Sequence, residues 1–308
     1  MFSGVFTRPK VDILIDVPEG RKNGKIQTSN GEIIKLPFLE IDEKVSGKII
    51  INCSQCRDFE HKGIHLEFFG IIENISDPKD IFKFISLNTD IEPFGILKNE
   101  INTFPFDFKR VQKQYESYRG ETRNIKYFLR LLIDTKLKTL IYEKEFLVMN
   151  TKPKSILNEN NKPIKIEVGV EDWLHLVFQL NSRNYSINDT LIGKITFKKV
   201  SIKMTKMDIQ ITKKEIINID NINNEPISTI LTLFEIMDGC PIKNEEIPIR
   251  LYLKPYNLTP SFETKRFSVK FFVSIVLTDV ENRKYYKHHE ISVFRIEKEK
   301  RKNNDNEN

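Results

Sequence analysis

The side chains best suited to metal binding or nucleophilic catalysis are few in this chain and lie apart in the sequence. Five histidines and three cysteines carry that chemistry, at His61, His65, His175, His288, His289, Cys53, Cys56 and Cys240. Cys53 and Cys56 form one Cys-x-x-Cys pair, but structural zinc requires four ligands and the sequence offers no second pair. We therefore interpret the pair as a turn at the end of a strand and expect no metal site.

Motifs that bind phosphate or build a catalytic centre are missing as well. The sequence contains no Gly-rich phosphate loop, no Gly-x-Ser-x-Gly elbow and no His-Glu-x-x-His. Two acidic doublets, Asp42-Glu43 and Glu171-Asp172, are typical of solvated charge at strand or turn edges. The sequence therefore predicts a protein that is not an enzyme and carries no cofactor.

Charge and composition narrow the class of partner. Of 308 residues 30% are charged and 39% hydrophobic, with a net charge of +6. The basic residues are spread along the chain, whereas a nucleic-acid footprint requires a concentrated basic stripe, so we expect no nucleic-acid partner. The densest basic cluster precedes an Asn-rich end, and we expect residues 298–308 to form a disordered tail, with contact to anionic lipid as the alternative.

The same composition predicts a location. No apolar run reaches the roughly 18 residues of a membrane-spanning helix, and residues 1–10 lack the apolar core of a secretory signal. Three cysteines are too few for a disulfide framework, so we expect reduced thiols and a cytoplasmic protein.

Apolar residues recur at every second position in many segments, which is the period of a strand with one buried face. Four such rows are Tyr127 to Ile133, Leu174 to Leu180, Ile247 to Leu253 and Phe271 to Leu277. Turn signals such as Ser76-Asp77-Pro78 and Asp238-Gly239 lie between strand-like segments. The chain is predicted to be all-β.

The sequence also repeats itself at nearly constant spacing. Val45–Ile49 resembles Leu191–Ile195, Ile125–Leu129 resembles Val269–Val273, and Glu145–Val148 resembles Glu290–Val293, with offsets of 144 to 146 residues. Each copy has the size of an immunoglobulin-like β-sandwich. We predict two tandem sandwiches, at residues 11–148 and 164–297. Residues 149–163, rich in Asn and Pro, form the predicted linker.

Several strings resemble the arrestin-like subunit of retromer, the cargo-sorting coat of endosomes. The most specific is FEIMDGCPIK at Phe234–Lys243. Others are Val45–Lys48, His61–Ile64, Tyr115–Gly120, Glu167–His175, Leu191–Ile195, Ile247–Leu251 and Lys265–Val269. They follow the family order from about residue 12 to 296, with departures at residues 77–98, 221–224 and in the short tail.

The resemblance implies a scaffold made of two arrestin-like β-sandwiches. Its C-terminal domain is expected to bind the α-solenoid subunit of retromer through Ile236 and Met237. It also implies a third subunit in the complex, sorting nexins and cargo receptor tails as partners, and peripheral attachment to the endosome membrane through them. Asp42 lies where the family contacts a nexin, although the chain is one residue shorter there.

The residues give Ile236 and Met237 a physical interpretation of their own. The pair stands beside the turn at Asp238-Gly239, where apolar side chains have little reason to be exposed unless a partner covers them. Two core residues at the edge of a sheet would explain the pair equally well from sequence alone. The alternative function for the whole chain is another arrestin-like cytosolic trafficking or signalling adaptor.

Overall fold

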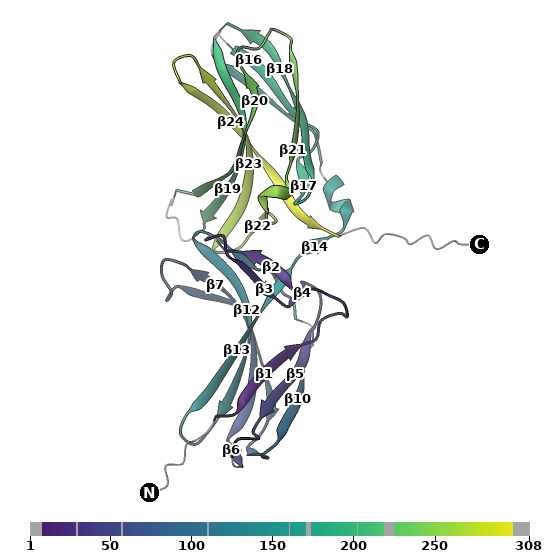
Figure 1. Ribbon diagram of the computed structural model, residues 1–308, viewed down its shortest axis with the longest axis vertical. Coiled ribbons are helices and arrows are strands. Elements are labelled where there is room, and N and C mark those ends of the chain that lie inside the picture. The colour runs from purple at the N-terminus through teal and green to yellow at the C-terminus, as the bar shows by residue number, and fades with distance from the viewer. Residues whose placement is uncertain are drawn as a thin grey trace, which may run out of the picture. The chain divides into compact units, whose positions relative to one another are not determined.

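The computed structural model describes residues 8–28, 30–56, 58–109, 111–159, 161–170, 174–201, 203–218 and 225–297. Within these ranges the regular structure is β-strand apart from two short 3-10 helices, Lys154–Asn158 and Lys254–Tyr256 (Figure 1). The prediction of an all-β chain is therefore confirmed. The chain divides into two compact units, one ending at Asn150 and the other beginning at Thr151, within the stretch predicted as the linker.

The first unit is a sandwich of a three-stranded and a six-stranded sheet. The smaller sheet has the order β1-β5-β10, and the larger β4-β13-β12-β7-β8 with β11 beside β12. Phe68 of β7 and Phe108 of β10 contact each other between the sheets, with ring centroids 5.9 Å apart. The strands are β1 (Lys10–Ile15), β4 (Phe38–Glu40), β5 (Val45–Asn52), β7 (Gly63–Asn74), β8 (Ile81–Glu92), β10 (Ile101–Phe108), β11 (Tyr118–Arg119), β12 (Arg123–Asp134) and β13 (Thr139–Met149).

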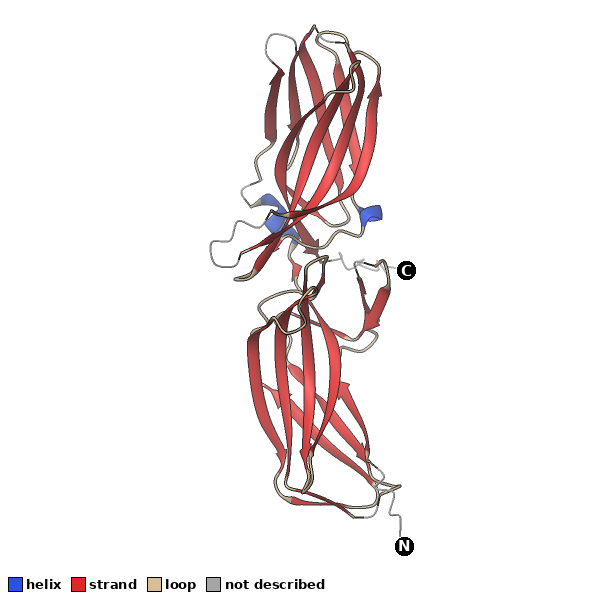
Figure 2. Ribbon diagram, turned by 90° about the vertical axis from the view of Figure 1, so that its left-hand side faces the viewer, coloured by secondary structure: helices blue, strands red, loops and turns tan. Residues whose placement is uncertain are grey.

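Two small two-stranded sheets accompany this sandwich. They pair β2 (Gly24–Gln27) with β3 (Ile33–Leu36) and β6 (Phe59–His61) with β9 (Gly95–Leu97). Figure 1 labels the strands β2, β3 and β6, and Figure 2 draws the strands of the chain in red.

The second unit repeats the arrangement with a four-stranded and a seven-stranded sheet. Their orders are β15-β16-β18-β21 and β14-β24-β23-β19-β20, with β17 beside β24 and β22 beside β23. The strands are β14 (Thr151–Lys152), β15 (Ile164–Val170), β16 (Leu174–Leu180), β17 (Asn184–Ser186), β18 (Thr190–Val200), β19 (Met204–Ile217), β20 (Ile227–Asp238), β21 (Glu246–Tyr252), β22 (Phe262–Glu263), β23 (Phe267–Asp279) and β24 (Lys284–Ile296).

The alternating rows predicted from the sequence lie in the two cores. Tyr127, Leu129, Leu131 and Ile133 are completely buried on β12, and the row from Phe271 to Leu277 is buried in the same way on β23. Both strands are central in their sheets, so one face of each packs into the sandwich while the other carries the polar residues.

The pairing pattern confirms the predicted duplication. In both units a short strand joins the last long strand in parallel, β4 with β13 and β17 with β24, and a two-residue strand joins its neighbour, β11 with β12 and β22 with β23. The two units differ at one edge, because β15 has no counterpart among the described strands of the first unit.

The predicted linker contains more regular structure than expected. Within residues 149–163, β14 pairs with β24 and a 3-10 helix follows, so part of this stretch belongs to the second sandwich. The predicted tail at residues 298–308 lies outside the described residues.

Candidate protein-binding site

Ile236 and Met237 lie near the end of β20, the edge strand of the seven-stranded sheet. Both side chains are half-buried. The turn begins only at Gly239, whose φ of 93° is a conformation that glycine adopts without strain. The pair is therefore part of a strand and stands directly before the turn.

A β-bulge separates the environments of the two residues. Met237 lies opposite the buried Met207 of β19, and the next register pair is Glu235 with Asp208. Ile236 is thus the extra residue of β20, without a partner directly across the ladder. A bulge bends and twists its strand, and this re-aims the side chain that it carries.

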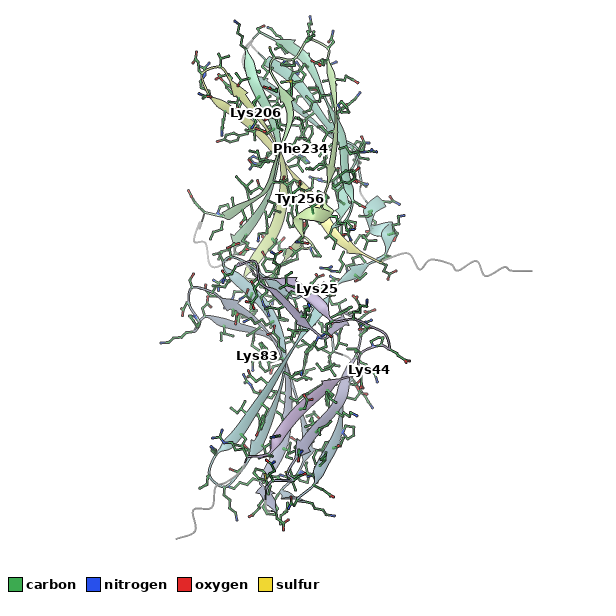
Figure 3. The ribbon with its side chains drawn as sticks, viewed as in Figure 1. Lys25, Lys44, Lys83, Lys206, Phe234 and Tyr256 are labelled. Atoms are coloured by element: carbon green, nitrogen blue, oxygen red, sulfur yellow. The ribbon has the colours of Figure 1, made fainter. Side chains whose placement is uncertain are left out.

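Exposed apolar side chains continue along the whole of β20. Ile227, Ile230, Leu233 and Phe234 are 45 to 60% exposed. Figure 3 labels Phe234 on this strand. We call these four residues, together with Ile236 and Met237, the β20 row; they occupy both faces of the edge strand, since the consecutive residues Leu233 and Phe234 lie opposite Gln210 and Ile209 of β19. Monomeric proteins seldom leave so many apolar side chains of one strand exposed, which makes this edge a candidate for a protein contact.

Sequence reasoning found the last two members of the β20 row and missed the other four. The available signal was the loss of strict alternation between Ile227 and Met237, where apolar residues occur on both faces. A second register shift in β20, between the partners of Ile211 and Thr212, explains why the alternation breaks.

An ion-pair cluster holds the end of β20 against β19. The Lys206 Nζ lies 3.1 Å from Asp208 Oδ1 and 3.2 Å from Glu235 Oε2. Hydrogen bonds to Asp208 and then to Glu235 raise the pKa of Lys206 above its usual value. The cluster fixes the strand beside Ile236. The side chains at this end of β20 that a partner could still cover are those of the half-buried pair Ile236 and Met237.

The loop after β20 is attached to neighbouring strands at both ends. The Gly239 amide donates to the Thr205 carbonyl at 2.8 Å, and the Asn244 amide donates to the Phe197 carbonyl at 2.6 Å. Between these two points the Ile242 side chain is 74% exposed. The loop thus adds another outward apolar side chain to the region.

Asp42 belongs to the other unit, in the turn between β4 and β5, and is exposed. Its neighbour Glu43 accepts two hydrogen bonds from the Arg21 guanidinium, at 2.6 and 2.7 Å, and one from the Glu40 amide at 2.7 Å. The Arg21 bonds hold the pKa of Glu43 below its usual range. The buried Lys113 donates to the Glu43 carbonyl, and burial lowers the pKa of Lys113.

These contacts order the turn while Asp42 itself faces solvent. Asp42 and the β20 row are therefore features of two separate units.

The residues considered for catalysis are dispersed. The Cys56 amide donates to the Cys53 carbonyl at 2.8 Å, which closes a turn, and both cysteines are buried and not in a disulfide. His65 contacts Asp90 at 2.7 Å on the surface. Across the described ranges no group of three His, Cys, Asp or Glu residues is placed to hold a metal ion. Glu171 and Asp172 lie outside the described residues.

The described part of the chain also has no helix long and apolar enough to cross a membrane.

Two duplicated β-sandwiches in tandem define an arrestin-like protein, and the exposed apolar side chains of the edge strand β20 make it a candidate for binding other proteins. Comparison with known proteins agrees, since the Vps26 family model, described as vacuolar protein sorting-associated protein 26, matches residues 7–282. The chain belongs to the Vps26 family. Membership of this family makes it a protein-sorting component.

Relatives from distant eukaryotes match over almost the whole chain. The chain is 40% identical to vacuolar protein sorting-associated protein 26 of Dictyostelium discoideum, across 96% of this chain and 84% of that protein. It is 35% identical to the 26B protein of Arabidopsis thaliana, across 95% and 96%. It is 37% identical to the 26B protein of Mus musculus, across 96% and 87%.

Proposed function

We propose that this chain is a non-enzymatic scaffold subunit of a retromer-type complex, and that its C-terminal unit binds an α-solenoid subunit through Ile236 and Met237. The half-buried position of this pair at the end of an exposed apolar edge strand carries the proposal. Family membership and the resemblance around Phe234–Lys243 support the identity of the partner.

The energetics of the β20 row suit a protein contact. Burying one large apolar side chain contributes about 1.5–3 kcal/mol, and a few such residues usually provide most of the affinity of an interface. Met237 supplies a flexible, polarizable side chain that adapts to a helical surface. Because the row is apolar, its affinity is expected to depend weakly on salt.

The other proposed partners, sorting nexins and cargo receptor tails, bind away from Ile236 and Met237. Sorting nexins are proposed to engage the N-terminal unit near Asp42, and cargo receptor tails to bind exposed strand edges as added strands. The solenoid subunit would connect the chain to the third subunit. The protein would then be cytoplasmic and reach the endosome membrane peripherally, through its partners. The alternative remains another arrestin-like trafficking or signalling adaptor.

Co-purification with a recombinant α-solenoid subunit tests the proposal. The double variant Ile236→Asp with Met237→Asn is expected to keep its fold, because both side chains are only half-buried, and to lose the solenoid subunit. The matched control is Ile192→Asp with Tyr252→Asn, which alters two exposed apolar residues on the other sheet of the same unit. Undiminished co-purification of the first variant, or equal loss with the control, would contradict the assignment.

A further inference from the structure

The two units differ at the free edge of β1. The glycines Gly47 and Gly193 occupy the same place in β5 and β18, so Ile15, which lies opposite Gly47, corresponds to Leu180, which lies opposite Gly193. By the same register Ile13 corresponds to Phe178 and Val11 to Leu176. In the second unit β15 pairs with these three residues. Among the described residues of the first unit, no strand pairs with β1 on that side.

The backbone of β1 presents its hydrogen-bonding groups to this edge. The Asp16 amide donates to the Ser46 carbonyl at 2.8 Å, so the even-numbered residues of β1 are those bonded to β5. The N–H and C=O groups of Val11, Ile13 and Ile15 consequently point the other way. The Pro9 carbonyl has the same orientation and accepts a hydrogen bond from the Tyr142 hydroxyl at 2.9 Å.

The burial of the side chains on β1 also indicates that a neighbouring strand is missing at this edge. Leu176, Phe178 and Leu180 are completely buried in the unit that has β15. Their counterparts Val11 and Ile15 are only half-buried, while Ile13 is covered. An added strand would complete the burial of this row.

The β1 edge is also regular, as the β15 edge is, whereas the edges formed by β8, β10, β20 and β21 are interrupted. Proline interrupts β10 at Pro105 and β21 at Pro248, and register shifts bend both β8 and β20. Proteins use proline and bulges to prevent unwanted strand addition. The six residues of β1 pair with β5 in unbroken register and include no proline.

We propose that the free edge of β1 binds an extended segment of a partner protein as an added antiparallel strand. β15 is the template for its chemistry, with Ile164, Ile166 and Val168 buried and Lys165 and Glu167 on the outer face. The partner segment therefore carries branched apolar residues at alternate positions. A basic residue lies where β15 has Glu167, because that position faces Asp12 on β1. The proposal rests on the proposed binding of partner tails at strand edges, for which it names one edge, and it is independent of the solenoid contact on β20.

The probe is a fluorescent peptide with residues 162–170 of this chain and the substitution Glu167→Lys, added to the full-length protein. We expect saturable anisotropy, and amide hydrogen exchange of Val11, Ile13 and Ile15 slowed at least tenfold by the bound peptide. N-methylation of the peptide at Ile166 removes the donor that faces Ile13 and is expected to abolish binding. N-methylation at Lys165, whose amide faces solvent, is the matched control and is expected to retain it.

Charge reversal provides a second test without altering the core. Asp12→Lys in the protein is expected to weaken binding of the Glu167→Lys peptide about two- to fivefold, and to strengthen binding of the unsubstituted peptide by a similar factor. Equal effects of the two N-methyl groups, or protection outside β1, would overturn the proposal. It would also be overturned if the peptide bound only after removal of residues 1–7, or if β1 were protected without peptide through self-association at higher protein concentration.

Discussion

Gly47 and Gly193 lie in matching positions of the two units, and at each of them a backbone carbonyl of the neighbouring strand leaves no room for a Cβ atom. A Cβ on Gly47 would lie 2.0 Å from the carbonyl oxygen of Leu14, and a Cβ on Gly193 would lie 2.2 Å from that of Gln179. Each carbonyl belongs to the neighbouring strand, one residue before the partner of the glycine. The sequence repeat thus preserves a close approach of two backbones.

Alanine at either glycine is expected to destabilise its unit by about 1–3 kcal/mol, because a backbone carbonyl cannot rotate out of the way as a side chain can. Gly169→Ala is the control, since the nearest atom to its added Cβ is 3.9 Å away. Urea unfolding followed by circular dichroism measures the three variants. Equal stability of Gly47→Ala and Gly169→Ala would show that the strands separate at little cost.

His61 makes the stability of the first unit sensitive to acid. Its side chain is buried, neither ring nitrogen has a hydrogen-bond partner, and burial lowers its pKa while Glu92 opposes the shift. In the unfolded chain the His61 imidazole takes up a proton near pH 6.5, whereas in the folded protein its burial disfavours the protonated form. The stability that depends on neutral His61 is therefore present above about pH 6.5 and is lost as the pH falls below it.

His61→Phe is expected to remove this part of the pH dependence. Unfolding free energies measured at pH 7.5 and 5.5 should differ less for the variant than for the wild-type protein. His65→Phe is the control, because His65 lies on the surface beside Asp90. A variant that loses as much stability on acidification as the wild type would contradict the role of His61.

Much of the fold could be predicted because it depends on local periodicity. The rows on β12 and β23 alternate over central strands, where one face is buried and the register is unbroken along the row. The constant offset between repeats then predicts the duplication. Local periodicity did not predict the edge strand β20, because two bulges relative to β19 break the alternation of apolar and polar residues along it.

The candidate site was only partly predictable for a related reason. Ile236 and Met237 were identified through resemblance, but their position in a strand follows from pairing with residues about thirty positions earlier. The turn at Asp42 depends on Arg21, 22 residues away from Glu43. No local pattern shows that such a pair will meet, since tertiary packing brings the two side chains together.

Substitutions at Asp42 and Glu43 are expected to distinguish an effect on nexin binding from an effect on the stability of the first unit. Asp42→Ala alters an exposed side chain and should change the free energy of unfolding by less than about 0.5 kcal/mol. Glu43→Ala removes three hydrogen bonds and should cost about 1–3 kcal/mol. If the proposed nexin contact is correct, Asp42→Ala weakens nexin binding in isothermal titration while stability is retained. Unchanged affinity would remove Asp42 from the proposed interface.

Phe234 provides the sharpest test of how far the solenoid contact extends along β20. It lies opposite Ile209, which is completely buried, yet is itself 45% exposed. Phe234→Ser should therefore affect binding more than stability. If the partner covers the whole β20 row, the variant weakens solenoid binding about tenfold or more, as truncation of a central apolar residue does. The loss should be similar at 50 and 500 mM salt, because no charge is removed.

Tyr286→Ser is the matched control, since this aromatic residue is 69% exposed on β24 of the same sheet. It is expected to leave the affinity unchanged. If Phe234→Ser also binds normally while Ile236→Asp with Met237→Asn does not, the contact is confined to the end of the strand. If instead the wild-type affinity falls steeply between 50 and 500 mM salt and Phe234→Ser binds as the wild type does at both, the contact is electrostatic, through Lys206 and Glu235, and not the apolar one argued from the exposed side chains.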